Sequence, residues 1–175
     1  AFLMVETKLG SYLGDRDALS VLASLARASE LGQIAPFLKT LRGDADRTAY
    51  ADWAARDRSE WAYRELAALL RYVTANKQAP GAIPCSIYGA IGICQFMPSN
   101  ALRFGVDGDG NGTLDLFTPA DAIVSVASYL RGHGWKPGMS AAERDKVVYA
   151  YNHSDLYVLA VTTVADRIRA RLGGY

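Results

Sequence analysis

Apolar residues recur every three or four positions along most of the chain, which is the spacing of one face of an α-helix. Between residues 59 and 77 the apolar side chains on one such face are Trp61, Leu66, Leu69, Leu70 and Val73. Alternation with a period of two, which would indicate strands, is not convincing anywhere. The pattern therefore predicts a mainly α protein without a sheet core.

Capping residues mark the ends of three predicted elements. Thr118-Pro119-Ala120-Asp121 combines a cap, a proline at the first helical position and an early carboxylate, so a helix should run from there to about Gly132. Ser140 to Glu143 is a capping box that starts another helix. A last helix should start near Ser154 and end before Gly173.

Glycine and proline mark the connections. Residues 78–84, Gln-Ala-Pro-Gly-Ala-Ile-Pro, cannot continue a helix. Residues 107–112 carry three glycines between acidic residues, and a short hairpin over 113–117 stays open. The most apolar stretch, 156–161, is far shorter than the ~18 residues that span a bilayer, and we expect it in a core helix.

Composition and charge narrow the function classes. Half of the 175 residues are apolar, 21% are charged and the net charge is +1, as in an ordinary globular domain. This balance gives no support for a nucleic-acid partner. Cys85 and Cys94 are the only cysteines, and they are either bridged or two buried thiols.

The first segment with chemical potential is Val5-Glu6-Thr7-Lys8-Leu9-Gly10. Glu6 follows an apolar helical run, and partial burial there would raise the pKa of its carboxyl, as a general acid requires. By itself the segment is weak evidence, because a lone glutamate near a helix end is more often solvated.

A second segment, residues 86–99, combines small residues with polar and apolar side chains. Gly89, Ala90 and Gly92 allow close approach of a backbone or a ligand, and Ser86 and Gln95 offer hydrogen bonds that suit a carbohydrate. Taken alone, tight packing with Gln95 satisfied internally is the favoured interpretation.

The third segment resembles the calcium loop of an EF-hand. Asp107, Asp109 and Asn111 occupy positions 1, 3 and 5, and a glycine occupies position 6. Position 12 is Thr118 rather than glutamate, and Asp121 is the expected substitute. An acidic turn without metal is the alternative, and a bound cation would be structural.

The fourth segment, Tyr149 to Tyr157, places aromatic and amide groups at a helix entry. They either line a sugar groove or cap and pack the last helix. A zinc site at His153 is not expected, because the chain has only two histidines.

In this order the four segments resemble the membrane-bound lytic transglycosylase B family, over residues 5–165. The motifs are Val-Glu-Thr-x-x-Gly, Ser-x-x-Gly-Ala-x-Gly-x-x-Gln-Phe-Met-Pro-Ser, the loop followed by Asp-Ala-Ile-x-Ser-Val-Ala-x-Tyr, and Tyr-Asn-His-Ser-Asp-x-Tyr. The resemblance implies a lysozyme-like helical catalytic domain over residues 1–175. It also implies cleavage of the β-1,4 bond between N-acetylmuramic acid and N-acetylglucosamine in peptidoglycan, leaving 1,6-anhydromuramic ends.

The resemblance assigns roles to individual residues. Glu6 stands at the catalytic acid/base position, and a structural Ca²⁺ would be held by Asp107, Asp109, Asn111, Asp121 and the Thr113 carbonyl. Groove positions match Ser86, Gln95, Tyr151 and Asn152, and more loosely Arg58 and Trp61. The chain departs from the family at Cys94 and Leu9 and carries an apparent insertion at 31–57, and by this resemblance we expect the family's N-terminal segment to be truncated in it.

The resemblance also predicts where the protein acts and with what. We expect a monomer in the bacterial periplasm or cell envelope, with peptidoglycan strands as partner, no organic cofactor, and membrane contact only through an N-terminal anchor that the chain would have lost. Two alternatives stay open: a hydrolytic muramidase using a second carboxylate among Asp15, Asp17 and Asp155, and a non-catalytic wall-binding module.

Overall fold

Seven α-helices make up most of the part of the chain that the structure describes. The computed structural model describes residues 1–29 and 45–173. The helices are α1 (Phe2–Thr7), α2 (Ala18–Ala26), α4 (Ala45–Ala75), α5 (Pro98–Phe104), α6 (Pro119–Gly132), α7 (Ala141–Tyr151) and α8 (Asp155–Arg171). A 3₁₀ turn, η3 (Pro80–Ala82), follows α4. The mainly α fold predicted from the pattern is confirmed.

The only sheet in the described residues is a two-stranded antiparallel ladder of β1 (Arg16–Asp17) and β2 (Pro84–Cys85), with Arg16 opposite Cys85. It joins the start of α2 to the loop after α4. No pattern in the sequence predicted it, because a two-residue strand is too short to show alternation. The hairpin left open at 113–117 does not form, and this irregular segment is tied to the side chains of Tyr72, Asn76 and Asp121.

The capping signals were accurate. Thr118 caps α6 through the N–H of Asp121, Ser140 and Glu143 form the reciprocal capping box of α7, and Ser154 caps α8. Each cap satisfies N–H groups that have no partner within their helix.

Two predictions about apolar residues were wrong. The helix expected from Ser59 begins at Ala45, and Leu70 on its expected apolar face is exposed. Leu156 and Leu159, expected in a core helix, are 79% and 62% exposed, while Val161 on the same helix is buried. The insertion expected at 31–57 lies outside the described residues up to position 44, and its remainder forms the first turns of α4.

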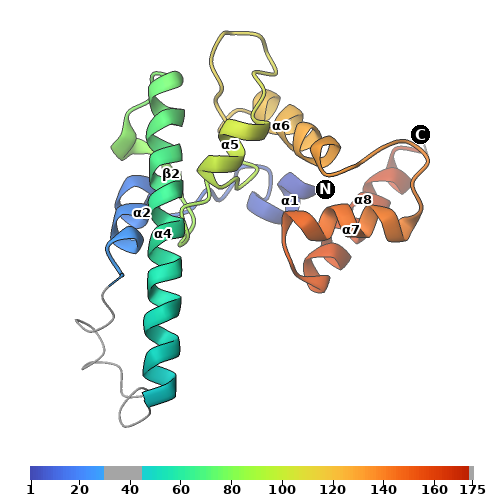
Figure 1. Cartoon of the computed structure of the whole chain (residues 1–175). Helices are drawn as coiled ribbons and strands as arrows, with labels where there is room; N and C mark the ends of the chain where they lie inside the picture. The colour runs from blue at the N-terminus through green and yellow to red at the C-terminus, as the bar shows by residue number, and fades with distance from the viewer. Residues whose placement is uncertain (30–44, 174–175) are drawn as a thin grey trace.

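The helices form two groups with α1 between them (Figure 1). On one side α2 packs along α4, which also contacts α5, and on the other α7 and α8 form a pair; α1 contacts α8. One apolar core cluster includes Leu22 of α2, Tyr72 of α4, Phe96 of the loop before α5, and Val161 of α8. The core thus fixes the position of α1 relative to both groups.

Two side chains from the end of α4 bond to backbone groups and hold the loop before α6. The Tyr72 hydroxyl accepts from the N–H of Leu116 at 3.3 Å, and Asn76 Oδ1 accepts from the N–H of Leu114 at 2.6 Å. Burial raises the pKa of Tyr72 to about 12, so this hydroxyl stays neutral. Both residues sit at or just beyond the end of α4, which therefore anchors the acidic loop.

Both cysteines are buried and unbridged, which decides between the two alternatives left open. Burial raises the pKa of Cys85 to about 11 and that of Cys94 to about 12. The thiols are inert packing groups in this environment. None of the helices in the described residues has the length and apolar character needed to cross a membrane.

Candidate active site

The end of α1 places Glu6 by an unusual backbone path. Lys8, Leu9 and Gly10 have φ values of 51°, 59° and 89°, so three successive residues are left-handed. Such conformations are costly for residues with side chains and persist only where surrounding contacts enforce them. The chain therefore turns sharply just after the helical turn that carries Glu6.

Thr7 supplies those contacts. Its hydroxyl donates to the Ile93 carbonyl at 2.9 Å and accepts from the Gly10 N–H at 2.9 Å, and the side chain is almost fully buried. Thr7 thus ties the end of α1 to the loop over residues 86–96. The residue that follows Glu6 fixes the distance between Glu6 and that loop.

Tyr157 of α8 holds the Glu6 carboxyl. Its hydroxyl donates to Glu6 Oε1 at 2.5 Å. Burial raises the pKa of Glu6, although the hydrogen bond from Tyr157 acts in the opposite direction. Position in the last turn of α1 also disfavours a negative charge there, because the C-terminal end of a helix carries negative partial charge. Partial burial was the environment predicted for Glu6.

Tyr157 was missed as a site residue in the sequence. Tyr157 is 151 positions from Glu6 along the chain. The segment that contains it, Tyr149 to Tyr157, is compatible both with a sugar groove and with packing of the last helix. Burial and the nearby Glu6 carboxylate raise the pKa of Tyr157 far above its ordinary value. Tyr157 therefore stays protonated at neutral pH and can donate its hydrogen bond to Glu6.

Tyr151 packs against the pair formed by Glu6 and Tyr157. Its ring stacks on that of Tyr157, with centroids 6.1 Å apart and planes 8° from parallel, and its hydroxyl donates to the Cys94 carbonyl at 2.5 Å. Burial raises the pKa of Tyr151 well above its usual range. Tyr151 thus links α7 to the residue before Gln95, while Asn152, the C-cap of α7, is exposed beside it.

The loop over residues 86–96 is packed tightly, as its small residues suggested. A Cβ at Gly92 would lie 2.5 Å from Leu116 Cβ, and one at Gly89 would lie 2.7 Å from Leu22 Cδ2. These glycines thus serve packing of the loop against its neighbours. Gln95 has φ 50° and its Nε2 donates to the Gly92 carbonyl at 3.0 Å, so part of its polar capacity is used internally.

At its other end the loop meets α4. The Ser86 hydroxyl accepts from the N–H groups of Tyr88 and Ala90, which shapes the turn there. The Arg58 guanidinium lies 5.7 Å from the centroid of the Trp61 ring and 5.8 Å from that of Tyr88. Arg58 and Trp61, predicted loosely, are thus brought together with Tyr88, which the sequence did not single out.

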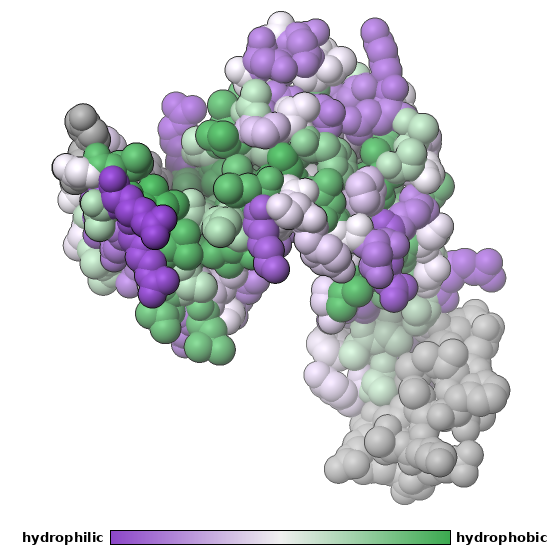
Figure 2. Space-filling model, turned by 180° about the vertical axis from the view of Figure 1, so that it is seen from behind, coloured by the Kyte–Doolittle hydropathy of each residue, from purple (hydrophilic) through white to green (hydrophobic). Residues whose placement is uncertain are grey.

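Predicted site residues, together with the unpredicted Tyr157 and Tyr88, therefore form two groups joined by one loop. Glu6, Tyr151 and Tyr157 lie at its Ile93–Cys94 end, and Arg58, Trp61 and Tyr88 lie at its Ser86 end. In the space-filling view the molecule is hollowed between the α7–α8 side and the α4 side (Figure 2).

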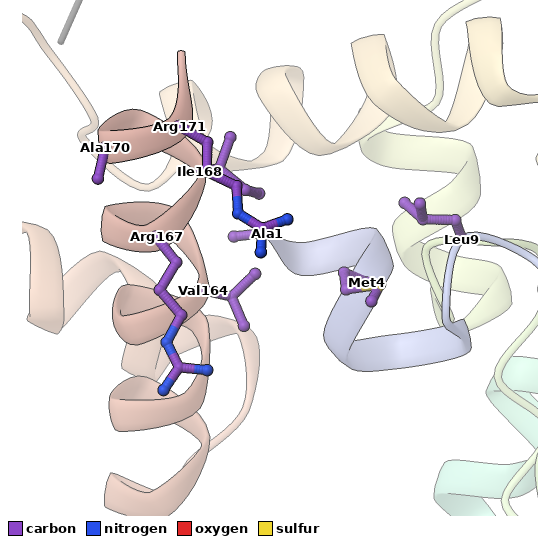
Figure 3. Close-up of a pocket in the computed structure, with 8 residues that line it drawn as sticks. All are labelled: Ala1, Met4, Leu9, Val164, Arg167, Ile168, Ala170 and Arg171. Atoms are coloured by element: carbon purple, nitrogen blue, oxygen red, sulfur yellow. The ribbon is translucent and has the colours of Figure 1, made fainter. Parts of the chain in front are cut away.

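An apolar pocket beside α1 is a different feature. It has a volume of about 730 Å³ and lies between α1 and the last turns of α8, with Arg167 and Arg171 at its side (Figure 3). Its lining is almost entirely apolar and includes no carboxyl group. It therefore offers no general acid and is not the candidate active site.

The acidic loop brings its carboxylates together. Oxygen atoms of Asp107, Asp109 and Asp121 lie within 4.8 Å of one another. Asp107 accepts from the N–H groups of Gly110 and Gly112, and these hydrogen bonds lower the pKa of its carboxyl. Asp121 is fully buried and accepts from the N–H groups of Gly108 and Asp115.

This donor set suits a hard divalent cation. All its side-chain donors are oxygens, which Ca²⁺ prefers, and three carboxylates converge where like charges would otherwise repel. Asn111 Oδ1 accepts hydrogen bonds from the N–H and the hydroxyl of Thr113, and these bonds close the turn that follows Asn111 in the loop. Asp115 is turned toward the N–H of Phe117, 3.0 Å away.

A family model described as transglycosylase SLT domain matches residues 1–145. The chain belongs to this family. Membrane-bound lytic murein transglycosylase B of Escherichia coli K12 is 39% identical over 85 residues, which are 49% of this chain and 24% of that protein. The resemblance read from the motifs is confirmed, and the matched segment spans about a quarter of that relative.

Solved structures share the fold of this transglycosylase-family chain. The soluble lytic transglycosylase SltB1 of Pseudomonas aeruginosa has a TM-score of 0.78 at 22% identity, over 98% of this chain and 69% of that one. Slt35 of Escherichia coli in complex with calcium has a TM-score of 0.74 at 23% identity, over 97% and 64%. SltB3 of Pseudomonas aeruginosa with NAG-anhNAM-pentapeptide has a TM-score of 0.72 at 20% identity, over 96% and 55%.

Proposed function

We propose that this domain is a lytic transglycosylase that cleaves the β-1,4 bond between N-acetylmuramic acid and N-acetylglucosamine in peptidoglycan. Glu6 is its single general acid and base. The observation that carries the proposal is a carboxyl whose pKa is raised by burial and which one tyrosine hydroxyl holds in place. Membership of the transglycosylase SLT domain family supports the assignment.

The chemistry needs one carboxyl group because the substrate supplies the nucleophile. Neutral Glu6 gives its proton to the glycosidic oxygen as the bond from that oxygen to C1 of muramic acid breaks. The Glu6 carboxylate then takes the proton of the C6 hydroxyl, whose oxygen bonds to C1 and closes the 1,6-anhydro ring. The attack is intramolecular, so its entropic cost is low, and no water is consumed.

The three carboxylates considered for a hydrolytic mechanism have other positions. Asp17 caps α2 through the N–H groups of Leu19 and Ser20, and Asp15 is exposed beside Arg16. Asp155 is exposed and lines a separate pocket between α7 and α8 that does not include Glu6. These observations favour transglycosylation over hydrolysis, which needs a second carboxylate across the bond.

The predicted groove residues are proposed as substrate contacts because they lie on or around the loop over residues 86–96, which connects the two groups of site residues. Gln95 and Ser86 lie on that loop, Tyr151 and Asn152 at the end of α7, and Arg58 and Trp61 on α4. Amide and hydroxyl groups beside flat aromatic surfaces match the mixed polar and apolar faces of amino sugars.

The acidic loop is proposed to bind a structural Ca²⁺ through Asp107, Asp109, Asn111, Asp121 and the Thr113 carbonyl. Convergence of three carboxylates supports this, as does the calcium complex of Slt35, which shares the fold. The ion would stabilise the connection between α5 and α6 and takes no part in bond cleavage.

We propose that the protein acts as a monomer on glycan strands in the bacterial periplasm or elsewhere in the cell envelope, because peptidoglycan is found there. The complexes of the fold relatives support a glycan ligand, since SltB3 is seen with NAG-anhNAM-pentapeptide and Slt35 with bulgecin A.

Mass spectrometry of digested peptidoglycan tests the reaction directly. The protein should release fragments with anhydro ends, which are lighter by one water than hydrolysed ends. Glu6→Gln should abolish release, and Asp166→Asn, an exposed carboxylate on α8, should leave it unchanged. Reducing ends alone would identify a hydrolase, and unaltered release by Glu6→Gln would refute the role of Glu6.

A further inference from the structure

Two large aromatic side chains stand exposed in the N-terminal half of α4. Tyr50 and Trp53 are 68% and 60% exposed, and their ring centroids are 5.8 Å apart with planes at 40°. Neither ring belongs to the core cluster. A paired aromatic surface in water is a feature that a binding function would explain.

The ring pair lies on the same face of α4 as Trp61. A helix turns about 100° per residue, so Tyr50, Trp53 and Trp61 fall within an arc of about 80°. Over the eleven residues from Tyr50 to Trp61 the helix rises about 16 Å. The rings thus form a line along α4 that ends at the cluster of Arg58, Trp61 and Tyr88.

This face is turned away from α2. Ser59 donates to the carbonyl of Ala26 at the end of α2, and it lies about 180° around α4 from Tyr50 and about 120° from Trp53. In Figure 1, α2 lies on the outer side of α4, and the α7–α8 pair lies across from it. The aromatic line therefore lies on a side of α4 that is turned away from its contact with α2.

Charged side chains flank the rings. Arg56, Asp57, Glu60 and Arg64 are all exposed along this part of the helix. A protein interface would bury these charges at a cost, and a bilayer would exclude them. A pyranose ring needs a flat apolar surface for its C–H face and polar partners for its hydroxyls at the edge, which this arrangement offers.

We propose that Tyr50 and Trp53 form a distal glycan subsite that binds sugar rings of a peptidoglycan strand remote from the bond cleaved at Glu6. The proposal rests on the proposed function, and it predicts a preference for long strands over short fragments. A strand that contacts both the Trp61 cluster and the ring pair is held at two separated points, so its dissociation is slowed.

The test compares long and short substrates. The double variant Tyr50→Ala/Trp53→Ala should lower kcat/KM on intact glycan strands roughly tenfold, because it removes both rings of the subsite. It should leave kcat/KM on a peptidoglycan tetrasaccharide unchanged, because the proposed subsite binds sugar rings beyond those next to the bond that is cleaved. Tyr63→Ala is the matched control, since Tyr63 is 67% exposed on α4 but lies about 160° around the helix from Trp61.

Equal losses on both substrates, or equal behaviour of the double variant and Tyr63→Ala, would overturn the proposal. Binding separates this outcome from failure of the proposed function. In a Glu6→Gln background, sedimentation with purified glycan strands should weaken roughly tenfold when both rings are removed, whether or not the native protein cleaves. If the rings instead join two copies of this chain, sedimentation velocity will show a dimer that the double variant abolishes, which also contradicts a glycan subsite.

Discussion

At the scale of single residues, the site depends on the hydrogen bond between Tyr157 and Glu6 and on the partial burial of the Glu6 carboxyl. Glu6 could be recognised in the sequence because an apolar run precedes it and a family motif contains it. Its partner Tyr157 could not, since no periodicity relates residues of α1 and α8, and only folding places the hydroxyl 2.5 Å from the carboxylate. The direction of the pKa shift was predictable from burial, whereas the opposing effect of Tyr157 was not.

Tyr157→Phe should change the pH dependence of the reaction. The hydroxyl stabilises the Glu6 carboxylate, so its removal raises the pKa of Glu6 further. The general acid must be protonated, and activity is lost as pH rises through that pKa, so the alkaline limb of kcat/KM should move to higher pH. The freed carboxyl is also misoriented, and kcat should fall roughly tenfold or more. Tyr12→Phe, at an exposed tyrosine after α1, is the control. An unshifted limb would argue against this role for Tyr157.

At the scale of elements, the helices were more predictable than their contacts. Caps at Thr118, Ser140 and Ser154 act locally, so sequence alone located the starts of α6, α7 and α8. The start of α4 was missed because residues 45–58 lack a continuous apolar face, although alanine and arginine favour a helix there. The left-handed turn after α1 was also missed, because contacts of Thr7 with a distant loop enforce it.

Thr7→Val should separate α1 from the loop that it holds. Valine keeps the shape but leaves the buried Ile93 carbonyl and Gly10 N–H without their partner, which costs about 1–3 kcal/mol. Urea denaturation measures this loss, and activity should fall with it because Glu6 is adjacent. Ser11→Ala removes an exposed hydroxyl that bonds to the Lys8 carbonyl, and it should change stability by less than ~0.5 kcal/mol. Equal stability of the two variants would show that Thr7 does not fix the turn.

Removing calcium should destabilise the loop between α5 and α6. A ligand bound only by the folded state stabilises it, so a chelator should lower the Tm by roughly 5–10 °C if calcium is about a hundredfold above its Kd. In Asp107→Asn the response to chelator should be much smaller, whereas Asp166→Asn should respond like the native protein. Melting curves that are the same with and without chelator would count against a metal in this loop.

At the scale of the whole molecule, catalysis and stability should oppose each other at Glu6. The folded state raises the pKa of this carboxyl above its ordinary value of 4.5, so it binds a proton more tightly than the unfolded chain. Its ionisation therefore destabilises the fold as pH rises from about the unfolded pKa through the folded one.

Glu6→Gln should therefore be more stable than the native protein at neutral pH, as judged by its Tm. The advantage should shrink as pH falls toward the unfolded pKa, because native Glu6 is then neutral in both states. The carbonyl oxygen of the neutral amide can still accept a hydrogen bond from the Tyr157 hydroxyl. Asp166→Asn, at an exposed position, should show no such pH-dependent gain. A variant less stable than the native protein at neutral pH would mean that burial of Glu6 carries little free-energy cost.

By itself the sequence determined the helical class, the caps and the carboxyl that the chemistry needs, because these follow from local periodicity, local hydrogen bonds and a short motif. The tertiary structure decided which groups surround that carboxyl, how the acidic residues of the loop meet Asp121, and that Tyr88 joins Arg58 and Trp61. Those contacts connect residues that are far apart along the chain. They form because the helices pack around one core, and the residues next to them in the sequence do not determine them.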